Sequence, residues 1–198
     1  MVDRETFDRI KLKHGGYASW AVWAPTTGRA KSGIGDLDVL DPDRNPTLLE
    51  TLRNDVVMLG LNLARDRPRP LGNFHDFRGR AQDFKIRYAF AGTPYYSAYM
   101  TDLIKEVVEL KASNAVRQFK ESALLVGRNL QVLFDELTDL RCNAPTIIAF
   151  GGDVYRLARD IVPANQYSHL VRVRHYSDYS RSKEEYREEV LADLASAR

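Results

Sequence analysis

Two polar side chains stand directly after apolar runs and could do chemistry. Asn62 follows the apolar run 56–59, and His175 follows the alternating stretch 170–174. An amide oxygen can orient a water molecule but is not a strong base, whereas an imidazole can donate a hydrogen bond in either charge state. Open α/β sheets place their ligands where strands deliver polar side chains at their carboxyl ends, so these residues are the first candidates for a site.

Basic residues flank both candidates. The chain has 29 basic and 27 acidic residues, and a net charge of +2 does not by itself argue for nucleic acid. The basic residues near the candidates are Arg65, Arg67, Arg69, Arg78, Arg80, Lys85, Arg87, Arg172, Arg174, Arg181 and Lys183. If the two strand ends meet, these groups form a basic rim of the kind that binds a phosphate backbone. The alternative is that they are ordinary solvated side chains of loops and helices.

The composition limits the class of protein. A chain of 198 residues with 44% hydrophobic residues is long enough for one domain with a sizeable core. No apolar run approaches the roughly 20 residues that span a membrane, and the charged N-terminus lacks an apolar signal region, so we expect a cytoplasmic protein without a membrane partner. Cys142 is the only cysteine, which rules out an internal disulfide and a thiolate-bound zinc or iron–sulfur centre.

Apolar periodicity and turn residues predict the elements that must position the candidates. The expected helices cover residues 3–13, 48–53, 80–91, 103–111, 114–140 and 153–161, and a final helix starts at the capping-box match 182–185. The expected strands or extended segments cover residues 17–24, 55–60, 95–101, 145–150 and 170–174. Gly60 is expected to break the second of these.

The alternation of strands and helices predicts an α/β fold, a three-layer α/β/α sandwich with a mainly parallel sheet of about four strands. Right-handed crossovers would bring the strand ends at 60–62, 101–102, 150–152 and 175–177 to one edge of that sheet. No repeat, low-complexity tract or linker is evident, so residues 1–198 are expected to form one domain, with 1–46 as an N-terminal extension packed on it.

Four short motifs at those predicted strand ends resemble motifs of the uracil-DNA glycosylase superfamily. In chain order they are Gly60-Leu61-Asn62, Tyr99-Met100-Thr101-Asp102-Leu103-Ile104-Lys105, Ile148-Ala149-Phe150-Gly151 and His175-Tyr176-Ser177. The segments 18–23 and 72–76 look like an uncharacterised bacterial branch of that superfamily. The resemblance covers the chain from about residue 50 to its end, and residues 1–46 look specific to the branch.

The resemblance implies roles for several of these residues. In that superfamily the first motif supplies the residue that positions or activates the attacking water, a role that falls to Asn62. The last motif is His-Pro-Ser in many members, and His175 and Ser177 keep its first and third residues. Tyr179 falls where many members have an apolar wedge that fills the space left by the flipped base. Leu63 replaces the proline that follows the asparagine in mismatch-specific members.

Asp102 departs from the superfamily's pattern at a place that bears on base choice. Several members have an asparagine at this strand end, which accepts a hydrogen bond from uracil N3–H and donates one to O4. An ionised carboxylate accepts but cannot donate. Asp102 would therefore repel O4 and suit an exocyclic amine, unless a dry pocket keeps it protonated.

The remaining contacts with DNA are assigned from residue chemistry. A flipped base needs an aromatic face, which Phe74 or Phe77 of the long loop could supply, and a polar edge contact, which Asp102 could supply. Side-chain hydroxyls, basic groups and backbone N–H groups bind phosphates. The expected DNA-binding residues are Ser177, Tyr179, Arg65 and Arg174.

Each candidate also has a plain structural interpretation. Asn62 is a common turn residue, and Asp102 is a good helix cap. His175 at a strand end is more often a structural partner than a catalyst, and the two phenylalanines can anchor loops. His75 and Asp76 have no ligands spaced to join them around a metal ion, so neither a metal nor another cofactor is expected.

The expected function is a DNA glycosylase-like protein that hydrolyses the N-glycosidic bond of a damaged or deaminated base. This reaction needs an oriented water, a donor to the departing base anion and a pocket for the flipped base. Without a carboxylate base the site would be slow, which suits weakly bonded bases. The main alternative, favoured by Leu63 and Asp102, is a nucleic-acid or nucleotide binding protein with this fold and no glycosylase activity. A hydrolase of free nucleosides is a third hypothesis.

Overall fold

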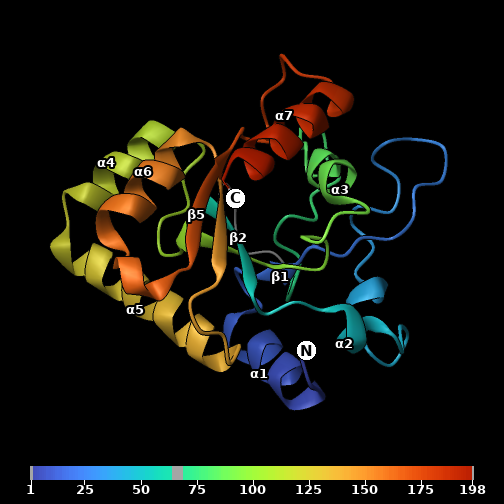
Figure 1. Cartoon of the computed structure of the whole chain (residues 1–198), viewed down its shortest axis with the longest axis horizontal. Coiled ribbons are helices and arrows are strands. Elements are labelled where there is room, and N and C mark those ends of the chain that lie inside the picture. The colour runs from blue at the N-terminus through green and yellow to red at the C-terminus, as the bar shows by residue number, and fades with distance from the viewer. Residues whose placement is uncertain (1, 64–68, 198) are drawn as a thin grey trace.

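A computed structural model describes residues 2–63 and 69–197 and has an α/β fold around a five-stranded sheet (Figure 1). The strands are β1 (Ser19–Trp20), β2 (Val56–Asn62), β3 (Tyr99–Ile104), β4 (Thr146–Phe150) and β5 (His169–Val173). Their order across the sheet is β1-β3-β2-β4-β5. β1 runs antiparallel to β3, and all other neighbours are parallel. The predicted α/β class and mainly parallel sheet are confirmed, with one strand more than expected because β1 pairs at the edge.

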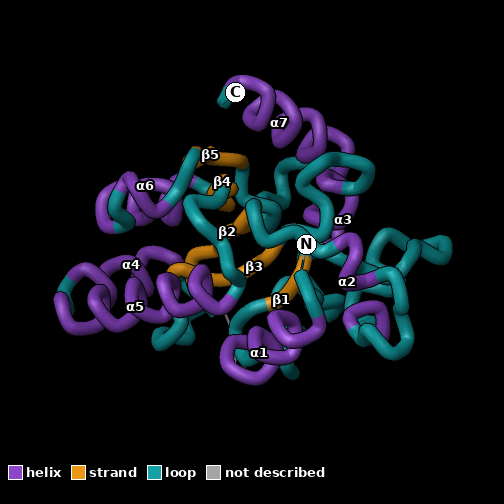
Figure 2. Tube along the Cα trace, turned by 60° about the horizontal axis from the view of Figure 1, so that its bottom comes forward, coloured by secondary structure: helices purple, strands orange, loops and turns teal. Residues whose placement is uncertain are grey.

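Helices cover both faces of the sheet (Figure 2). They are α1 (Arg4–His14), α2 (Leu48–Thr51), α3 (Phe84–Phe90), α4 (Ala112–Lys120), α5 (Ala123–Asp139), α6 (Gly152–Ile161) and α7 (Lys183–Ser196), with short 3-10 turns at Asp38–Leu40 and Ala164–Gln166. α4, α5 and α6 lie on one face, and α3 and α7 lie on the other, which gives the three layers predicted. Within the described residues, no helix is long and apolar enough to cross a membrane.

Each face of the sheet has its own hydrophobic core. Leu59 of β2 belongs to the core beneath α5 and α6, whereas Met58 belongs to the core beneath α3 and α7. Because side chains alternate along a strand, Asn62 lies on the same side of β2 as Met58. Asp102 likewise lies on the side of Met100, which packs in the core beneath α3 and α7. The two polar residues therefore face the same layer.

Several predicted elements differ in the structure. β2 runs through Gly60 instead of breaking there. Residues 105–111 are irregular rather than helical. The periodic stretch 114–140 forms two helices, because Oγ of Ser122 accepts a hydrogen bond from the N–H of Leu125 at 3.2 Å and so caps a new helix.

A buried polar network holds the carboxyl end of β3 against α5. Lys105 and Glu136 form an ion pair at 2.9 Å, with side chains only 3% and 0% exposed. Glu136 also accepts hydrogen bonds from the hydroxyls of Tyr99, at 2.7 Å, and Thr101, at 2.6 Å. Lys105 donates in addition to the backbone oxygen of Asp102 at 2.5 Å. The network therefore fixes the strand end that carries Asp102.

The N-terminal segment packs on the sheet and supplies its edge strand. Phe7 and Ile10 of α1 are fully buried in the core beneath α5. Trp20 of β1 packs edge-on against Tyr99 of β3, with ring centroids 5.2 Å apart. These contacts explain why a two-residue strand persists at the edge.

Candidate functional site

The four parallel strands end at one edge of the sheet, here called the carboxyl edge (Figure 1). Asn62 is the last residue of β2, and Asp102 pairs with Gly60 two residues before it. His175 lies two residues after the end of β5. The structure thus places all three sequence candidates at this edge, where right-handed crossovers predict them.

The amide of Asn62 is held in one orientation. Its Nδ2 donates to the backbone oxygens of Leu63, at 2.9 Å, and Glu109, at 2.8 Å. Because carbonyl oxygens can only accept, the nitrogen is identified by its partners. Among the described residues none donates to Oδ1 of Asn62, so this oxygen is the atom that can accept a hydrogen bond from a water molecule.

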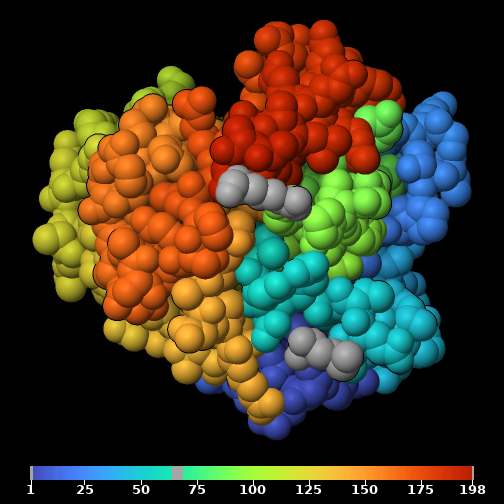
Figure 3. Space-filling model, viewed as in Figure 1, coloured from blue at the N-terminus to red at the C-terminus, as the bar shows by residue number. Residues whose placement is uncertain are grey.

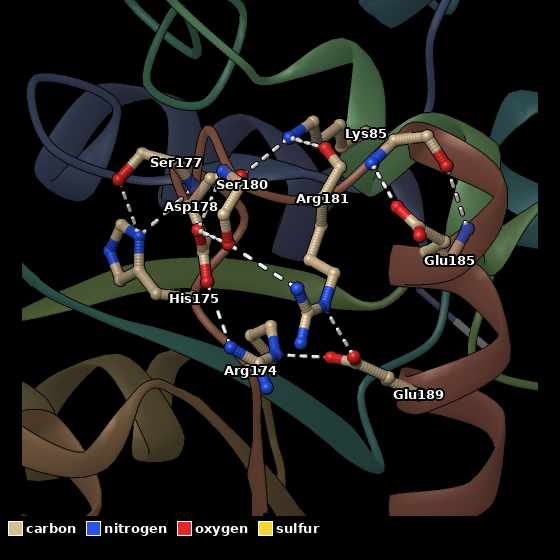
Figure 4. A network of polar contacts seen from close by, with 10 residues as sticks. Lys85, Arg174, His175, Ser177, Asp178, Ser180, Arg181, Glu185 and Glu189 are labelled. Carbon is tan, nitrogen blue, oxygen red and sulfur yellow. Dashed lines mark hydrogen bonds and ion pairs between the residues drawn. The ribbon is translucent and has the colours of Figure 1, made fainter.

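The imidazole of His175 is held in one tautomer. Its Nδ1 accepts hydrogen bonds from Ser177, from the backbone N–H at 3.1 Å and from the hydroxyl at 2.7 Å (Figure 4). Since a backbone N–H can only donate, the neutral ring carries its proton on Nε2. Burial lowers the pKa of His175 below its ordinary value, although the carboxylates of Asp153 and Asp178 oppose this shift. The ring is therefore a neutral Nε2–H donor at neutral pH.

A hollow of about 550 Å³ opens beside this ring and is called the His175 hollow. The residues of its lining used below are Gly151, Arg172, Arg174, His175, Asp178, Glu189 and Asp193. Asn62 and Asp102 do not line it. Gly151 has φ of 97°, and a Cβ there would lie 3.2 Å from Cβ of His175, so only glycine lets the β4–α6 turn pass this close to the ring.

Asp102 is buried beneath the carboxyl edge, with 3% of its surface exposed. Its Oδ2 accepts a hydrogen bond from Nδ2 of Asn73 at 2.8 Å, and its Oδ1 faces Gly60. Burial raises the pKa of Asp102 to about 7, against the opposing effects of Asn73 and Lys105. The helix-cap interpretation of Asp102 is wrong, because it lies inside β3 and the following residues are irregular.

The two aromatic candidates of the long loop have different environments in the structure. Phe74 is 4% exposed, and its ring meets the rings of Phe150 and Tyr176 at centroid distances of 6.3 and 6.4 Å. Tyr176 in turn stacks on His175 at 4.6 Å, so Phe74 links the surroundings of Asp102 to the ring of His175. Phe77 is 56% exposed and lies against Gly35 of the N-terminal segment. Phe74 therefore belongs to the candidate site, and Phe77 does not.

Three of the four expected DNA-binding residues are engaged within the protein. The N–H and the hydroxyl of Ser177 both donate hydrogen bonds to His175. Tyr179 is 63% exposed, and its hydroxyl donates to the backbone oxygen of Arg80 at 2.5 Å. Arg174 pairs with Asp178, at 2.8 Å, and with Glu189. The fourth residue, Arg65, lies outside the described residues.

The predicted basic rim is partly compensated where it is described, because four of its residues form ion pairs with carboxylates, namely Arg78, Arg174, Arg181 and Lys183. Arg78 pairs with Asp76 at 3.0 Å, and Arg181 shares Glu189 with Arg174. In the lining of the His175 hollow, Arg172 and Arg174 stand with Asp178, Glu189 and Asp193. Its charges of both signs favour a polar site over a continuous phosphate track.

Two residues that position the site were not predicted in that role. Nδ2 of Asn73 donates both to Asp102 and to the backbone oxygen of Tyr17, at 2.7 Å. Lys85 of α3 donates to the backbone oxygens of Asp178, at 2.7 Å, and Arg181, at 2.8 Å, and so anchors the loop after His175 (Figure 4). Asn73 follows a glycine in a long loop, which is a usable signal, whereas Lys85 was expected only as one charge of the basic rim.

No set of three or more histidine, cysteine, aspartate or glutamate side chains within the described residues is placed to hold a metal ion. Comparison of the chain with models of protein families, with curated proteins and with solved structures finds no match.

Proposed function

We propose that this protein is a DNA glycosylase-like hydrolase that cleaves the N-glycosidic bond of a damaged or deaminated base. One observation carries the proposal. Ser177 fixes His175 as a donor through Nε2 at the same sheet edge where Asn62 is tethered through its nitrogen and offers its oxygen. A fixed donor and a fixed acceptor meet two of the three requirements of this hydrolysis, and the third is a pocket for the base.

The chemistry follows from these two atoms. The leaving base becomes an anion, and the Nε2–H of His175 would donate a hydrogen bond to its oxygen as charge develops. The sugar becomes electron-poor, and Oδ1 of Asn62 would orient the water that adds to it. An amide does not remove a proton from this water; as the C–N bond breaks and the C–O bond forms, the proton passes to the base anion or to solvent. The reaction therefore depends on a good leaving group, which damaged bases provide.

Base recognition would fall to Asp102 and Phe74. Asn73 occupies one oxygen of Asp102, which leaves Oδ1 for a base edge. A carboxyl group with a pKa of about 7 exists in both charge states at neutral pH, so it can accept from an exocyclic amine or donate to a carbonyl oxygen. A base reaches this atom only if the ring of Phe74 moves aside, because Phe74 lies against Gly60.

The burial of Asp102 and Phe74 favours a second candidate function. Asp102 is 3% exposed and Phe74 is 4% exposed, which fits a protein that binds nucleic acid or a nucleotide without releasing a base. Leu63, in place of proline, fits the same alternative. The two candidates differ in one measurable product, the free base.

The test is a screen of duplex and single-stranded oligonucleotides that carry uracil, hypoxanthine, xanthine or a mismatch. Free base is measured by chromatography in the presence of EDTA. Asn62→Ala and His175→Ala are each expected to lose about 100-fold or more in rate. Asn165→Ala and His169→Ala, at exposed positions away from the carboxyl edge, are the matched controls.

Circular dichroism establishes that all four variants are folded. Full activity in both Asn62→Ala and His175→Ala would reject the site. Salt-dependent binding of the oligonucleotides without base release by the wild type would favour the binding protein instead. Turnover of free nucleosides without affinity for DNA would point to the third hypothesis.

A further inference from the structure

A second hollow, of about 540 Å³, lies between residues 23–30, α3 and the start of α7. It is called the aromatic hollow, and its residues used below are Trp23, Arg87, Tyr88, Ala91, Tyr96 and Lys183. It shares no lining residue with the His175 hollow. The N-terminal segment that forms one wall lies beside α3, blue beside green in Figure 3. Its volume is within the range of about 300–1,000 Å³ that is usual for small-molecule sites.

Arg87 brings a buried positive charge to this hollow. The residue is 8% exposed. Its Nη1 donates to the backbone oxygens of Ala24 and Ser32, both at 2.8 Å, and its Nη2 donates to that of Ala30 at 2.6 Å. No carboxylate of the described residues forms an ion pair with it. A buried charge is normally paired, so the guanidinium lacks the counter-charge that its position calls for.

The guanidinium also has unused donors. An arginine carries five N–H groups, and the three hydrogen bonds to backbone oxygens leave the Nε–H and one hydrogen of Nη2 without a partner among the described residues. Nε and Nη2 share one edge of the planar group. This is the edge that binds a carboxylate, sulfonate or phosphate in a bidentate manner.

Aromatic side chains form the walls around this charge. Trp23 and Tyr96 lie with ring centroids 6.3 Å apart, and the hydroxyl oxygen of Tyr96 accepts from the N–H of Trp23 at 3.3 Å, which leaves its own hydrogen to donate. Nζ of Lys183 stands 4.2 Å from the ring centroid of Tyr88, but it is paired with Glu184, so Arg87 supplies the unpaired charge. Aromatic faces and apolar walls favour a flat ring, and the guanidinium of Arg87 favours an acidic group on it.

We propose that the aromatic hollow binds a small planar aromatic anion, with its acidic group on the free edge of Arg87 and its ring against Trp23 and Tyr88. The site is separate from the carboxyl edge and does not depend on glycosylase activity. The plain alternative is that Arg87 only clamps residues 24–32 to α3. If Arg87 is only such a clamp, the aromatic hollow should not bind anions in preference to uncharged molecules.

The test uses two fluorescent probes of the same shape that differ in charge. They are 8-anilinonaphthalene-1-sulfonate, which carries a sulfonate, and N-phenyl-1-naphthylamine, which is uncharged. The proposal expects one sulfonate probe per chain, bound at least about tenfold more tightly than the uncharged probe, because a bidentate charged contact is added. Equal affinities, or binding without a fixed stoichiometry, would overturn it.

Variants locate the binding in the hollow. Ala91 lines the hollow and is exposed, so Ala91→Trp should fill it and weaken sulfonate-probe binding about tenfold or more. Ala195→Trp, on the exposed surface of α7 and outside both hollows, is the matched control and should change affinity little. Equal effects of the two substitutions would overturn the proposal.

Arg87→Gln removes the charge and keeps hydrogen-bond donors. It should abolish the preference for the sulfonate probe and leave the uncharged probe bound as before. A preference that survives in folded Arg87→Gln would overturn the role of this guanidinium. If circular dichroism shows that Arg87→Gln does not fold, the charge preference of the wild type and the effect of Ala91→Trp decide the question.

Discussion

Gly60 of β2 stands beside Asp102 of β3, and a Cβ at residue 60 would lie 2.2 Å from Oδ1 of that carboxyl group. The same Cβ would lie 3.0 Å from the ring of Phe74. The strand is continuous at this point, so the glycine does not serve as a turn. It makes room for a buried acid and an aromatic ring at the candidate site.

Gly60→Ala should destabilise the protein by about 1–3 kcal/mol, because the added methyl group has to displace a buried carboxyl group and a packed ring. Gly127→Ala is the matched control. A Cβ at Gly127 would meet nothing within 4 Å, and the residue lies inside α5, so this change should stabilise by about 0.5–1 kcal/mol. Urea denaturation measures both. If Gly60→Ala leaves the free energy of unfolding unchanged, the space that Gly60 leaves beside Asp102 and Phe74 is not needed.

Asp102 should make stability depend on pH. Burial raises its folded-state pKa to about 7 from an ordinary value of 3.8. Between these values the folded protein holds a proton that the unfolded chain has released, so the stability present at pH 4 is lost as pH rises through 7. Asp102→Asn removes this titration and keeps an acceptor for Asn73.

The gain in unfolding free energy from Asp102→Asn should therefore be larger at pH 8 than at pH 4, by at most about 4 kcal/mol. Urea denaturation at several pH values measures it. Asp135→Asn, at an exposed position of α5, is the control for loss of a carboxylate. A gain of the same size at both pH values would mean that Asp102 is ionised without penalty in the folded protein.

The placement of Asn62, Asp102 and His175 at one edge was predictable. Apolar runs locate the strands, and right-handed crossovers put the carboxyl ends of parallel strands on the same side. The partners of these side chains were not predictable, because backbone oxygens and acidic groups from distant segments supply them. Glu189, for example, lies in the final helix, and its pairing with Arg174 removes a cation from the expected phosphate contacts.

The sequence also does not distinguish the two loop phenylalanines, although they lie close together in the chain. Phe74 and Phe77 are three positions apart, and both are plausible stacking residues by type. Phe74 has φ of 62°, a conformation that bulky side chains rarely adopt, and its N–H donates to the side-chain oxygen of Asn73 at 3.1 Å. The ring of Phe74 lies in the core and that of Phe77 on the surface, a difference that residue types alone do not reveal.

The tautomer of His175 can be read directly by NMR. Because Ser177 donates to Nδ1, nitrogen shifts above pH 7 should show an unprotonated Nδ1 and a protonated Nε2. Burial lowers the pKa of this ring, so its titration midpoint should fall below 6.5. His169, which is exposed, provides the comparison within the same spectrum. A proton on Nδ1 would remove the donor on which the proposed stabilisation of the leaving base depends.

Lys85 should control the order of the loop after His175. Its ammonium group holds two backbone oxygens of that loop, those of Asp178 and Arg181. Lys85→Met keeps much of the side-chain volume and removes both hydrogen bonds, so it should cost about 1–3 kcal/mol of unfolding free energy. It should also speed hydrogen exchange at the amides of 177–182 more than elsewhere, because the segment loses its anchor to α3.

Lys120→Met, at an exposed position at the end of α4, is the matched control and should leave exchange in 177–182 unchanged. The same loop holds the donor to Nδ1 of His175, so Lys85→Met should also lower any base-release activity while Lys120→Met should not. Loss of activity without faster exchange would place Lys85 in direct contact with substrate. Unchanged exchange and unchanged activity would show that the ion pairs of Glu189 hold the loop without Lys85.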